Sequence, residues 1–221
     1  MPLAAVIFDM DGVISDTQDL HTYADNIVMA RYGIKVNPQQ LYEQFAGVPD
    51  KELYASVLGE HGLPDKAEEA VKAKWVIMEK HLHERIVPVS GVLELIDMLR
   101  SKGTFKLAVA SSSTSPFINL VLSTLGLKHK FDSITSADEV KQGKPHPDIF
   151  LLAARKLNVK PGECLVIEDA PMGMRAAKRA GMKCVGLVKD QHMSAENKRN
   201  YPADLLITDL NFLTPERLLT L

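Results

Sequence analysis

The sequence predicts an α/β fold, in which helices cover both faces of a parallel sheet and a small all-helical domain is inserted after the first strand. From residue 87 onward, short apolar runs alternate with segments of helical spacing. This alternation with short turns is typical of a parallel sheet. A further apolar run at residues 4–8 precedes the stretch 16–85, which has helical spacing and no convincing strand. The first strand therefore belongs with the later ones.

Helices in the inserted stretch are expected at residues 20–32, 38–45, 51–60 and 65–85, with a loop at 46–50. Gly33 ends the first of them, as glycine commonly does. In the remainder we expect strands at 106–110, 133–135, 164–167, 183–188 and 204–207, and helices at 91–102, 116–125, 148–157 and 172–180. We therefore predict a Rossmann-like core of residues 1–15 and 86–221 and a helical cap of residues 16–85.

The composition is that of an ordinary soluble globular protein, with 46% hydrophobic and 24% charged residues in a chain of 221. A formal net charge of -2 gives no support to a nucleic-acid-binding or membrane-binding role. The longest apolar runs have only the length of a strand. Cys164 and Cys184 lie beside apolar residues and are expected to fill the core as free thiols of a reducing compartment. We therefore expect a cytoplasmic protein.

Polar side chains gather where three of the expected strands end. They are Asp9 and Asp11, Ser111, and Glu168 and Asp169, with Lys144 in a neighbouring loop. Each of them alone could cap a turn or be solvated, and Ser113 or Thr114 is expected to cap the helix that begins at residue 116. Because the carboxyl ends of parallel strands meet at one edge of a sheet, we expect the set to converge there.

Such a set is suited to phosphoryl transfer. The carboxylates of Asp9, Glu168 and Asp169 supply the hard oxygen ligands that Mg²⁺ prefers. Lys144, with the hydroxyl and amides at Ser111-Ser112, would hold the phosphate oxygens. One carboxylate can attack phosphorus to give an aspartyl-phosphate. A neighbouring carboxylate can protonate the leaving oxygen and later activate water.

These residues resemble, in order and spacing, the four motifs of the haloacid dehalogenase superfamily. The motifs are Asp9-Met10-Asp11-Gly12, Ser111, Lys144 and Glu168-Asp169. The stretch from Phe8 to Thr17, followed by His21, further resembles the β-phosphoglucomutase-like branch, whose helical cap follows the first motif. The resemblance covers essentially the whole chain and implies a Mg²⁺-dependent enzyme with the fold predicted above.

The resemblance also implies a role for each carboxylate. Asp9 would be the nucleophile and a Mg²⁺ ligand. Asp11 would be the general acid and base, and its backbone carbonyl would bind the metal. Asp169, with Glu168 directly or through water, would complete the metal site.

Other positions would handle the phosphate and the proton. Ser111, Ser112 and Lys144 would bind the transferred phosphate, with a cis peptide bond expected between Lys144 and the proline that follows it. Thr17 and His21 match positions that steer the acid and base when the cap closes. His21 could equally be an ordinary exposed helix residue.

The loop at 46–51 departs from the pattern of the sugar-phosphate mutases in this branch. There, a basic residue shortly after the equivalent of Gly47 holds the distal phosphate of a bisphosphate. Here that position is Asp50, whose carboxylate would repel a phosphate. Lys51 could replace the basic residue or be solvated, and Lys72 or Lys74 could support it. We therefore predict a phosphatase for a small phosphorylated metabolite, a sugar phosphate, with β-phosphoglucomutase as the alternative.

Two further classes fit less well. A haloacid dehalogenase needs neither Asp11 nor a full magnesium shell, and a non-catalytic protein of this fold would be expected to lack a motif. Substrate specificity is expected from residues 46–51 and from the helix that carries His21 and Asp25. No partner beyond a small phosphorylated substrate is expected, and the habit of the family implies a monomer.

Overall fold

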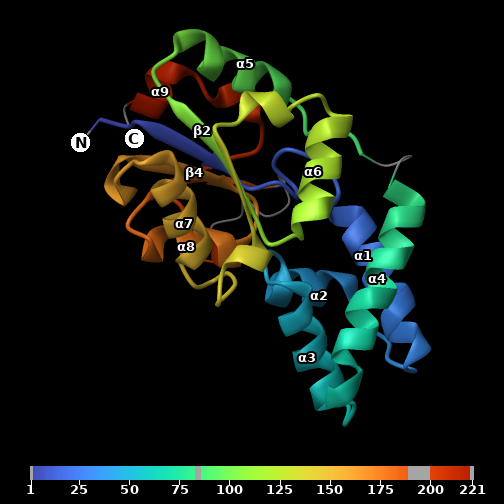
Figure 1. Cartoon of the computed structure of the whole chain (residues 1–221). Helices are drawn as coiled ribbons and strands as arrows, with labels where there is room; N and C mark the ends of the chain where they lie inside the picture. The colour runs from blue at the N-terminus through green and yellow to red at the C-terminus, as the bar shows by residue number, and fades with distance from the viewer. Residues whose placement is uncertain (1, 83–85, 189–199, 220–221) are drawn as a thin grey trace.

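The computed structural model describes residues 2–82, 86–188 and 200–219 (Figure 1). Its centre is a six-stranded parallel sheet with the strand order β3-β2-β1-β4-β5-β6. The strands are β1 Ala5–Phe8, β2 Lys106–Ser111, β3 Ser133–Ser136, β4 Cys164–Glu168, β5 Lys183–Leu187 and β6 Leu205–Ile207. Because β1 lies between β2 and β4, the residues that end these three strands are neighbours. The predicted α/β fold is confirmed.

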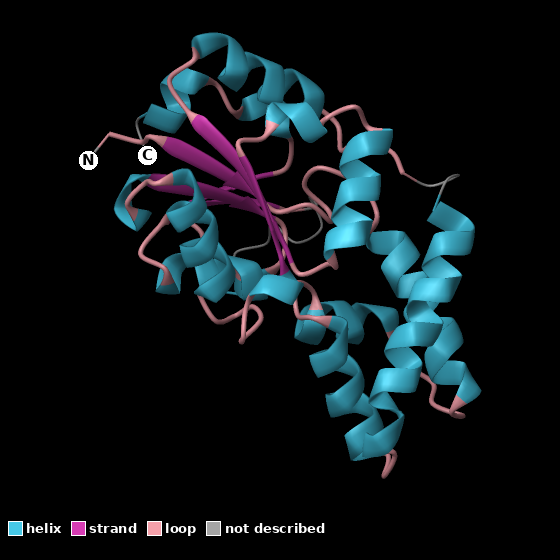
Figure 2. Cartoon of the chain, in the orientation of Figure 1, coloured by secondary structure: helices cyan, strands magenta, loops and turns pink. Residues whose placement is uncertain are grey.

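Alternation along the central strand divides the core into two layers. Val6 and Phe8 pack with the apolar faces of α5 (Val92–Lys102) and α6 (Ser115–Thr124). Ala5 and Ile7 pack on the other face, with α7 (Asp148–Leu157) and α8 (Pro171–Arg179). Figure 2 shows these helices on the two sides of the sheet. A strand buried on both faces explains why the first apolar run is continuous rather than alternating.

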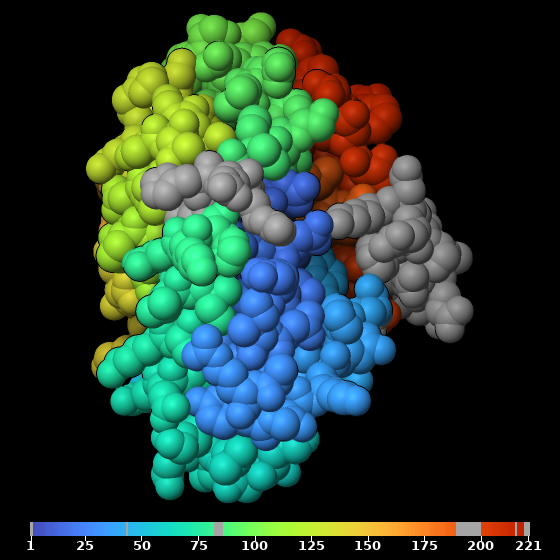
Figure 3. All heavy atoms as spheres, turned by 90° about the vertical axis from the view of Figure 1, so that its right-hand side faces the viewer, coloured from blue at the N-terminus to red at the C-terminus, as the bar shows by residue number. Residues whose placement is uncertain are grey.

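Four helices form a second body at the carboxyl edge of the sheet, which we call the cap. They are α1 Gln18–Arg31, α2 Pro38–Phe45, α3 Asp50–Glu60 and α4 Ala67–Leu82, and α1 and α4 lie side by side (Figure 3). The two connections to the core also run side by side: the Asp16 N–H donates to the Val87 carbonyl at 2.9 Å, and the Val89 N–H donates to the Ile14 carbonyl at 3.0 Å. The domain limits at residues 15 and 86 stay a prediction.

A few elements differ from the sequence expectations. The helix expected over residues 65–85 begins with a 3₁₀ turn at Pro64–Lys66, and residues 83–85 lie outside the described residues. The short helix α9 (Pro215–Leu219) was not expected, because five residues are too few to show a helical period. Cys164 and Cys184 are buried and free, as expected. Within the described ranges, every helix is too short or too polar to cross a membrane.

Candidate active site

The base of the site is a buried network of ion pairs at the carboxyl end of β1. Lys144 Nζ donates to Asp9 Oδ1 at 2.5 Å and to Glu168 Oε1 at 2.7 Å. The second oxygen of Glu168 accepts the Ala170 N–H at 2.7 Å. Lys144 and Glu168 have no exposed side-chain surface. The Lys144-Pro145 peptide bond is cis, as expected.

Three carboxylates meet beside this lysine. Asp9, Glu168 and Asp169 each offer an oxygen within 4.8 Å of the others. One ammonium group cannot neutralise three carboxylates. Burial raises the pKa of Asp9 to about 8. The ammonium group of Lys144 opposes this rise, and the carboxylate of Glu168 adds to it. This donor set of closely spaced hard oxygens with excess negative charge fits Mg²⁺.

Asp11 is held by side chains from both the core and the cap. Its Oδ1 accepts the Thr17 hydroxyl and lies 3.3 Å from His21 Nε2, and its Oδ2 accepts the Ser113 hydroxyl at 2.8 Å. Burial alone would raise the pKa of Asp11, but the nearby His21 and the two hydroxyls lower it to about 2. The His21 ring itself lies edge-on between Trp75 of the cap and a core phenylalanine, with centroid distances of 6.4 and 5.8 Å. The two predicted supporting residues thus both reach Asp11.

The three serines at the end of β2, Ser111 to Ser113, contact different groups. Ser111 Oγ lies 3.4 Å from Asp11 Oδ2 and accepts the Ser113 N–H at 3.1 Å. Ser112 Oγ donates to the carbonyl of Gly47, in the cap loop, at 2.5 Å. One expectation was that Ser113 caps α6, and the structure differs. Thr114 occupies the N-cap position, and its side chain makes no capping hydrogen bond. The Ser113 hydroxyl donates instead to Asp11, a role that was not predicted from the sequence.

The loop 46–50 closes over the site. A Cβ atom on Gly143, beside the site lysine, would lie 2.2 Å from Pro49 Cγ, and one on Gly47 would lie 3.7 Å from Lys144 Cδ. The Gly143 N–H points to Glu52 Oε1 at 3.4 Å. Cap and core are therefore in close contact at this loop.

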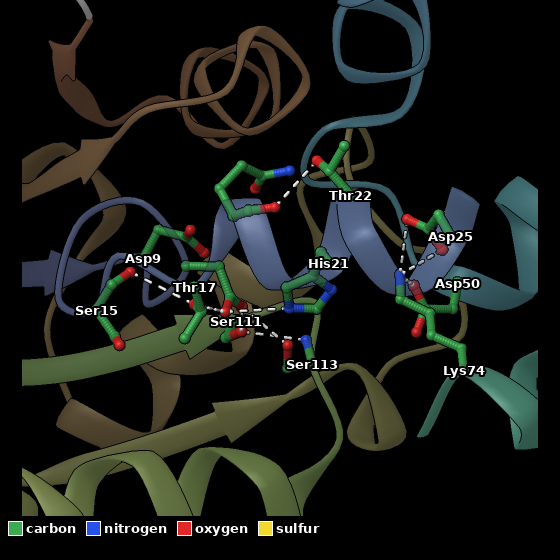
Figure 4. A network of polar contacts seen from close by, with 12 residues as sticks. Asp9, Ser15, Thr17, His21, Thr22, Asp25, Asp50, Lys74, Ser111 and Ser113 are labelled. Atoms are coloured by element: carbon green, nitrogen blue, oxygen red, sulfur yellow. Dashed lines mark hydrogen bonds and ion pairs between the residues drawn. The ribbon is translucent and has the colours of Figure 1, made fainter. Parts of the chain in front are cut away.

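Between the two bodies lies a cavity of about 60 Å³. Of the predicted site residues, those that line it are Asp9, Asp11, His21, Gly47, Asp50, Ser112 and Asp169. Lys74 and Asp25 line it as well, whereas Lys51 and Lys72 are exposed on the outside of the cap. Figure 4 shows Thr17, His21 and Ser113 converging near one end of this region and Lys74 between Asp25 and Asp50 at the other.

One cap residue near the carboxylates of Asp9, Glu168 and Asp169 was not predicted from the sequence. The Tyr42 hydroxyl lies 3.4 Å from Asp169 Oδ2, and burial together with Asp169 raises the tyrosine pKa. A tyrosine on an amphipathic helix carries no sequence signal for such a contact. The position of Asp25 in the lining of the cavity does have a sequence signal. Asp25 stands four residues after His21 and therefore lies on the same face of α1.

Comparisons with known proteins agree with this geometry. The chain is 37% identical over 190 residues to fructose-1-phosphate phosphatase YqaB of Escherichia coli, covering 82% of this chain and 95% of that protein. It is 32% identical over 225 residues to β-phosphoglucomutase of Bacillus subtilis, covering 98% and 94%. The crystal structure of β-phosphoglucomutase from Clostridium difficile matches 98% of this chain and 95% of its own, with a TM-score of 0.81 and 31% identity.

The family of haloacid dehalogenase-like hydrolases matches residues 6–187, which include every motif described above. The match therefore covers strands β1 to β5, the cap and the carboxyl ends of the strands that carry Asp9, Ser111 and Glu168, and it ends before β6. The chain belongs to the haloacid dehalogenase-like hydrolase family.

Proposed function

We propose that this protein is a Mg²⁺-dependent phosphatase that hydrolyses a small sugar phosphate through a phosphorylated Asp9. The observation that carries the proposal is the meeting of Asp9, Lys144 and two further carboxylates directly beneath the cavity that Asp11 lines. The name of the Escherichia coli relative supports a carbohydrate phosphate as the substrate.

Asp9, Glu168 and Asp169 would hold the magnesium ion. When bound, the ion supplies positive charge that lets an anionic phosphate approach the carboxylates. An Asp9 oxygen then forms a bond to phosphorus while the bond from phosphorus to the leaving oxygen breaks. Asp11 donates its proton to that oxygen, and a water molecule later gives a proton back to Asp11 as it attacks phosphorus and releases Asp9.

Asp11 must gain a proton before the first step, although His21 holds it ionised in the free protein. A bound phosphate dianion favours the protonated form of a neighbouring carboxyl group, because like charges repel. Substrate binding would therefore bring Asp11 toward the acid form, and loss of the leaving group would favour the base form. The hydroxyls of Thr17 and Ser113 donate to the two oxygens of Asp11 and would keep the carboxyl group oriented in either protonation form.

Release of phosphate from a generic aryl phosphate tests this proposal. It should require Mg²⁺, disappear in Asp9→Asn, and persist in Asp97→Asn, which changes an exposed carboxylate on α5. Full magnesium-dependent turnover by Asp9→Asn would contradict it. The mutase alternative, supported by the Bacillus subtilis relative, requires conversion of β-glucose 1-phosphate to glucose 6-phosphate with a trace of bisphosphate. The monomeric state and the cytoplasmic location stay predictions.

A further inference from the structure

The far wall of the cavity is a buried cluster of polar side chains from three cap helices. Lys74 on α4 is 1% exposed, and its Nζ lies 2.9 Å from Asp25 Oδ1 and 2.5 Å from Asp50 Oδ1. The Tyr54 hydroxyl on α3 donates to the same Asp25 oxygen at 2.7 Å. The three charged members line the cavity. We call Asp25, Asp50, Tyr54 and Lys74 the distal wall.

The distal wall carries one more negative charge than positive. Two carboxylates hold the single ammonium group of Lys74, and they raise its pKa even though burial would lower it. Asp50 Oδ2 accepts no hydrogen bond from any residue in the described ranges, and the Asp50 side chain is 15% exposed. This wall therefore offers an oxygen acceptor to a ligand, while its cation already has two partners.

Helix α1 sets the distance between this wall and the reacting groups. His21 contacts Asp11, and Asp25 follows four residues later on the same face (Figure 4). Since an α-helix rises 1.5 Å per residue, the wall lies about 6 Å further along α1 than His21 does. Asp9 and the charged residues of the wall line the same cavity, so one ligand can meet both.

On the basis of the proposed phosphatase function, we infer that the distal wall selects monophosphates whose far end carries uncharged hydroxyl groups and rejects a second phosphate. A hydroxyl donor gains a charge-assisted hydrogen bond to the free oxygen of Asp50. A second phosphate would instead meet the net negative charge of a wall whose side chains are largely buried, where repulsion is stronger than in bulk water.

Calorimetry on the Asp9→Asn variant with Mg²⁺ measures this selection without turnover. The probes are a hexose monophosphate, the bisphosphate of the same hexose, and hexyl phosphate, which keeps the phosphate and loses the hydroxyl groups. We expect the monophosphate to bind at least about tenfold more tightly than either of the other two, from one hydrogen bond to a charged group and one charge repulsion. Equal or tighter binding of the bisphosphate would overturn the inference.

A series of substitutions changes the charge of the wall in steps. Asp50→Asn takes it from one net negative charge to none, and adding Asp25→Asn makes it net positive. Each step should raise the affinity for the bisphosphate, relative to the monophosphate, by about tenfold. Asp65→Asn, an exposed carboxylate of the cap, should leave the ratio unchanged. A ratio that is the same across the series would overturn the inference.

The two proposals fail in different experiments. Absence of phosphate release from an aryl phosphate by the unsubstituted protein contradicts the phosphatase, because that substrate does not need the distal wall. Equal affinity for the monophosphate and the bisphosphate in the calorimetry contradicts the inference about the distal wall, because binding to Asp9→Asn does not need hydrolysis. If the substituted walls do not fold, the three probes on Asp9→Asn with its wall intact still decide the inference.

Discussion

Substitution of Gly12 by alanine should displace the side chain of Asp169, one of the three carboxylates proposed to bind Mg²⁺, by a distance that the structure defines. Gly12 has a φ of +82°, and a Cβ atom there would lie 2.2 Å from Asp169 Oδ2. Real Cβ contacts of under 3.0 Å essentially do not occur, so the Asp169 carboxylate would have to move by about 1 Å. The left-handed backbone costs alanine about 1 kcal/mol of stability in addition.

Gly181→Ala separates the two effects. Gly181 has a φ of +74° and open space around its Cα, so alanine there carries the backbone cost without the clash. In urea unfolding we expect Gly181→Ala to lose about 1 kcal/mol from the backbone cost alone, and Gly12→Ala to lose more because it also carries the clash. Only Gly12→Ala should lose Mg²⁺ affinity, by about 10- to 100-fold in calorimetry, with a matching rise in the Mg²⁺ needed for turnover. Unchanged Mg²⁺ affinity in Gly12→Ala would refute the assignment of Asp169 as a ligand.

Three further variants test the charges of the site. Without metal, Asp11→Asn should be less stable than the unsubstituted protein at pH 6, and the difference should vanish as pH falls from about 4 toward 2, because the folded-state pKa of about 2 lies below the ordinary 3.8. Lys144→Met leaves two buried carboxylates unpaired and should cost about 3–5 kcal/mol in urea unfolding, whereas the exposed Lys141→Met should cost little. Ser113→Ala removes a 2.8 Å bond to the acid and base and should lower kcat about tenfold, with no such loss in the exposed Ser101→Ala.

The sequence was sufficient to predict the positions of the groups that meet beneath the cavity. Asp9, Ser111 and Glu168 each stand where an apolar strand ends, and the topology of parallel sheets brings such ends together. Lys144 could be placed with them only through the resemblance to a family, because nothing local distinguishes it from a solvated lysine. The structure adds that its ammonium group lies between Asp9 and Glu168.

The contacts of the cap could not be predicted in the same way. The bond between Lys74 and Asp50 depends on how α3 and α4 pack, and helical periodicity does not determine this packing. Asp50 was expected to act as a lone carboxylate, whereas it shares Lys74 with Asp25 in a cluster that keeps one net negative charge. The hydroxyl of Ser113 could cap a helix or turn back to Asp11, and only the backbone path after β2 decides between them.

The most direct test of the central claim is to trap phosphate on the nucleophile. Protein mixed briefly with Mg²⁺ and an aryl phosphate is quenched in acid, digested and analysed by mass spectrometry. The account predicts one added phosphoryl group on the peptide that contains Asp9. Its level should be higher in Asp11→Asn, because an aryl phosphate releases a phenolate that does not need the acid of the first step, whereas the second step lacks its base. Phosphate on a different residue during turnover, or turnover without any phosphorylated peptide in either protein, would contradict it.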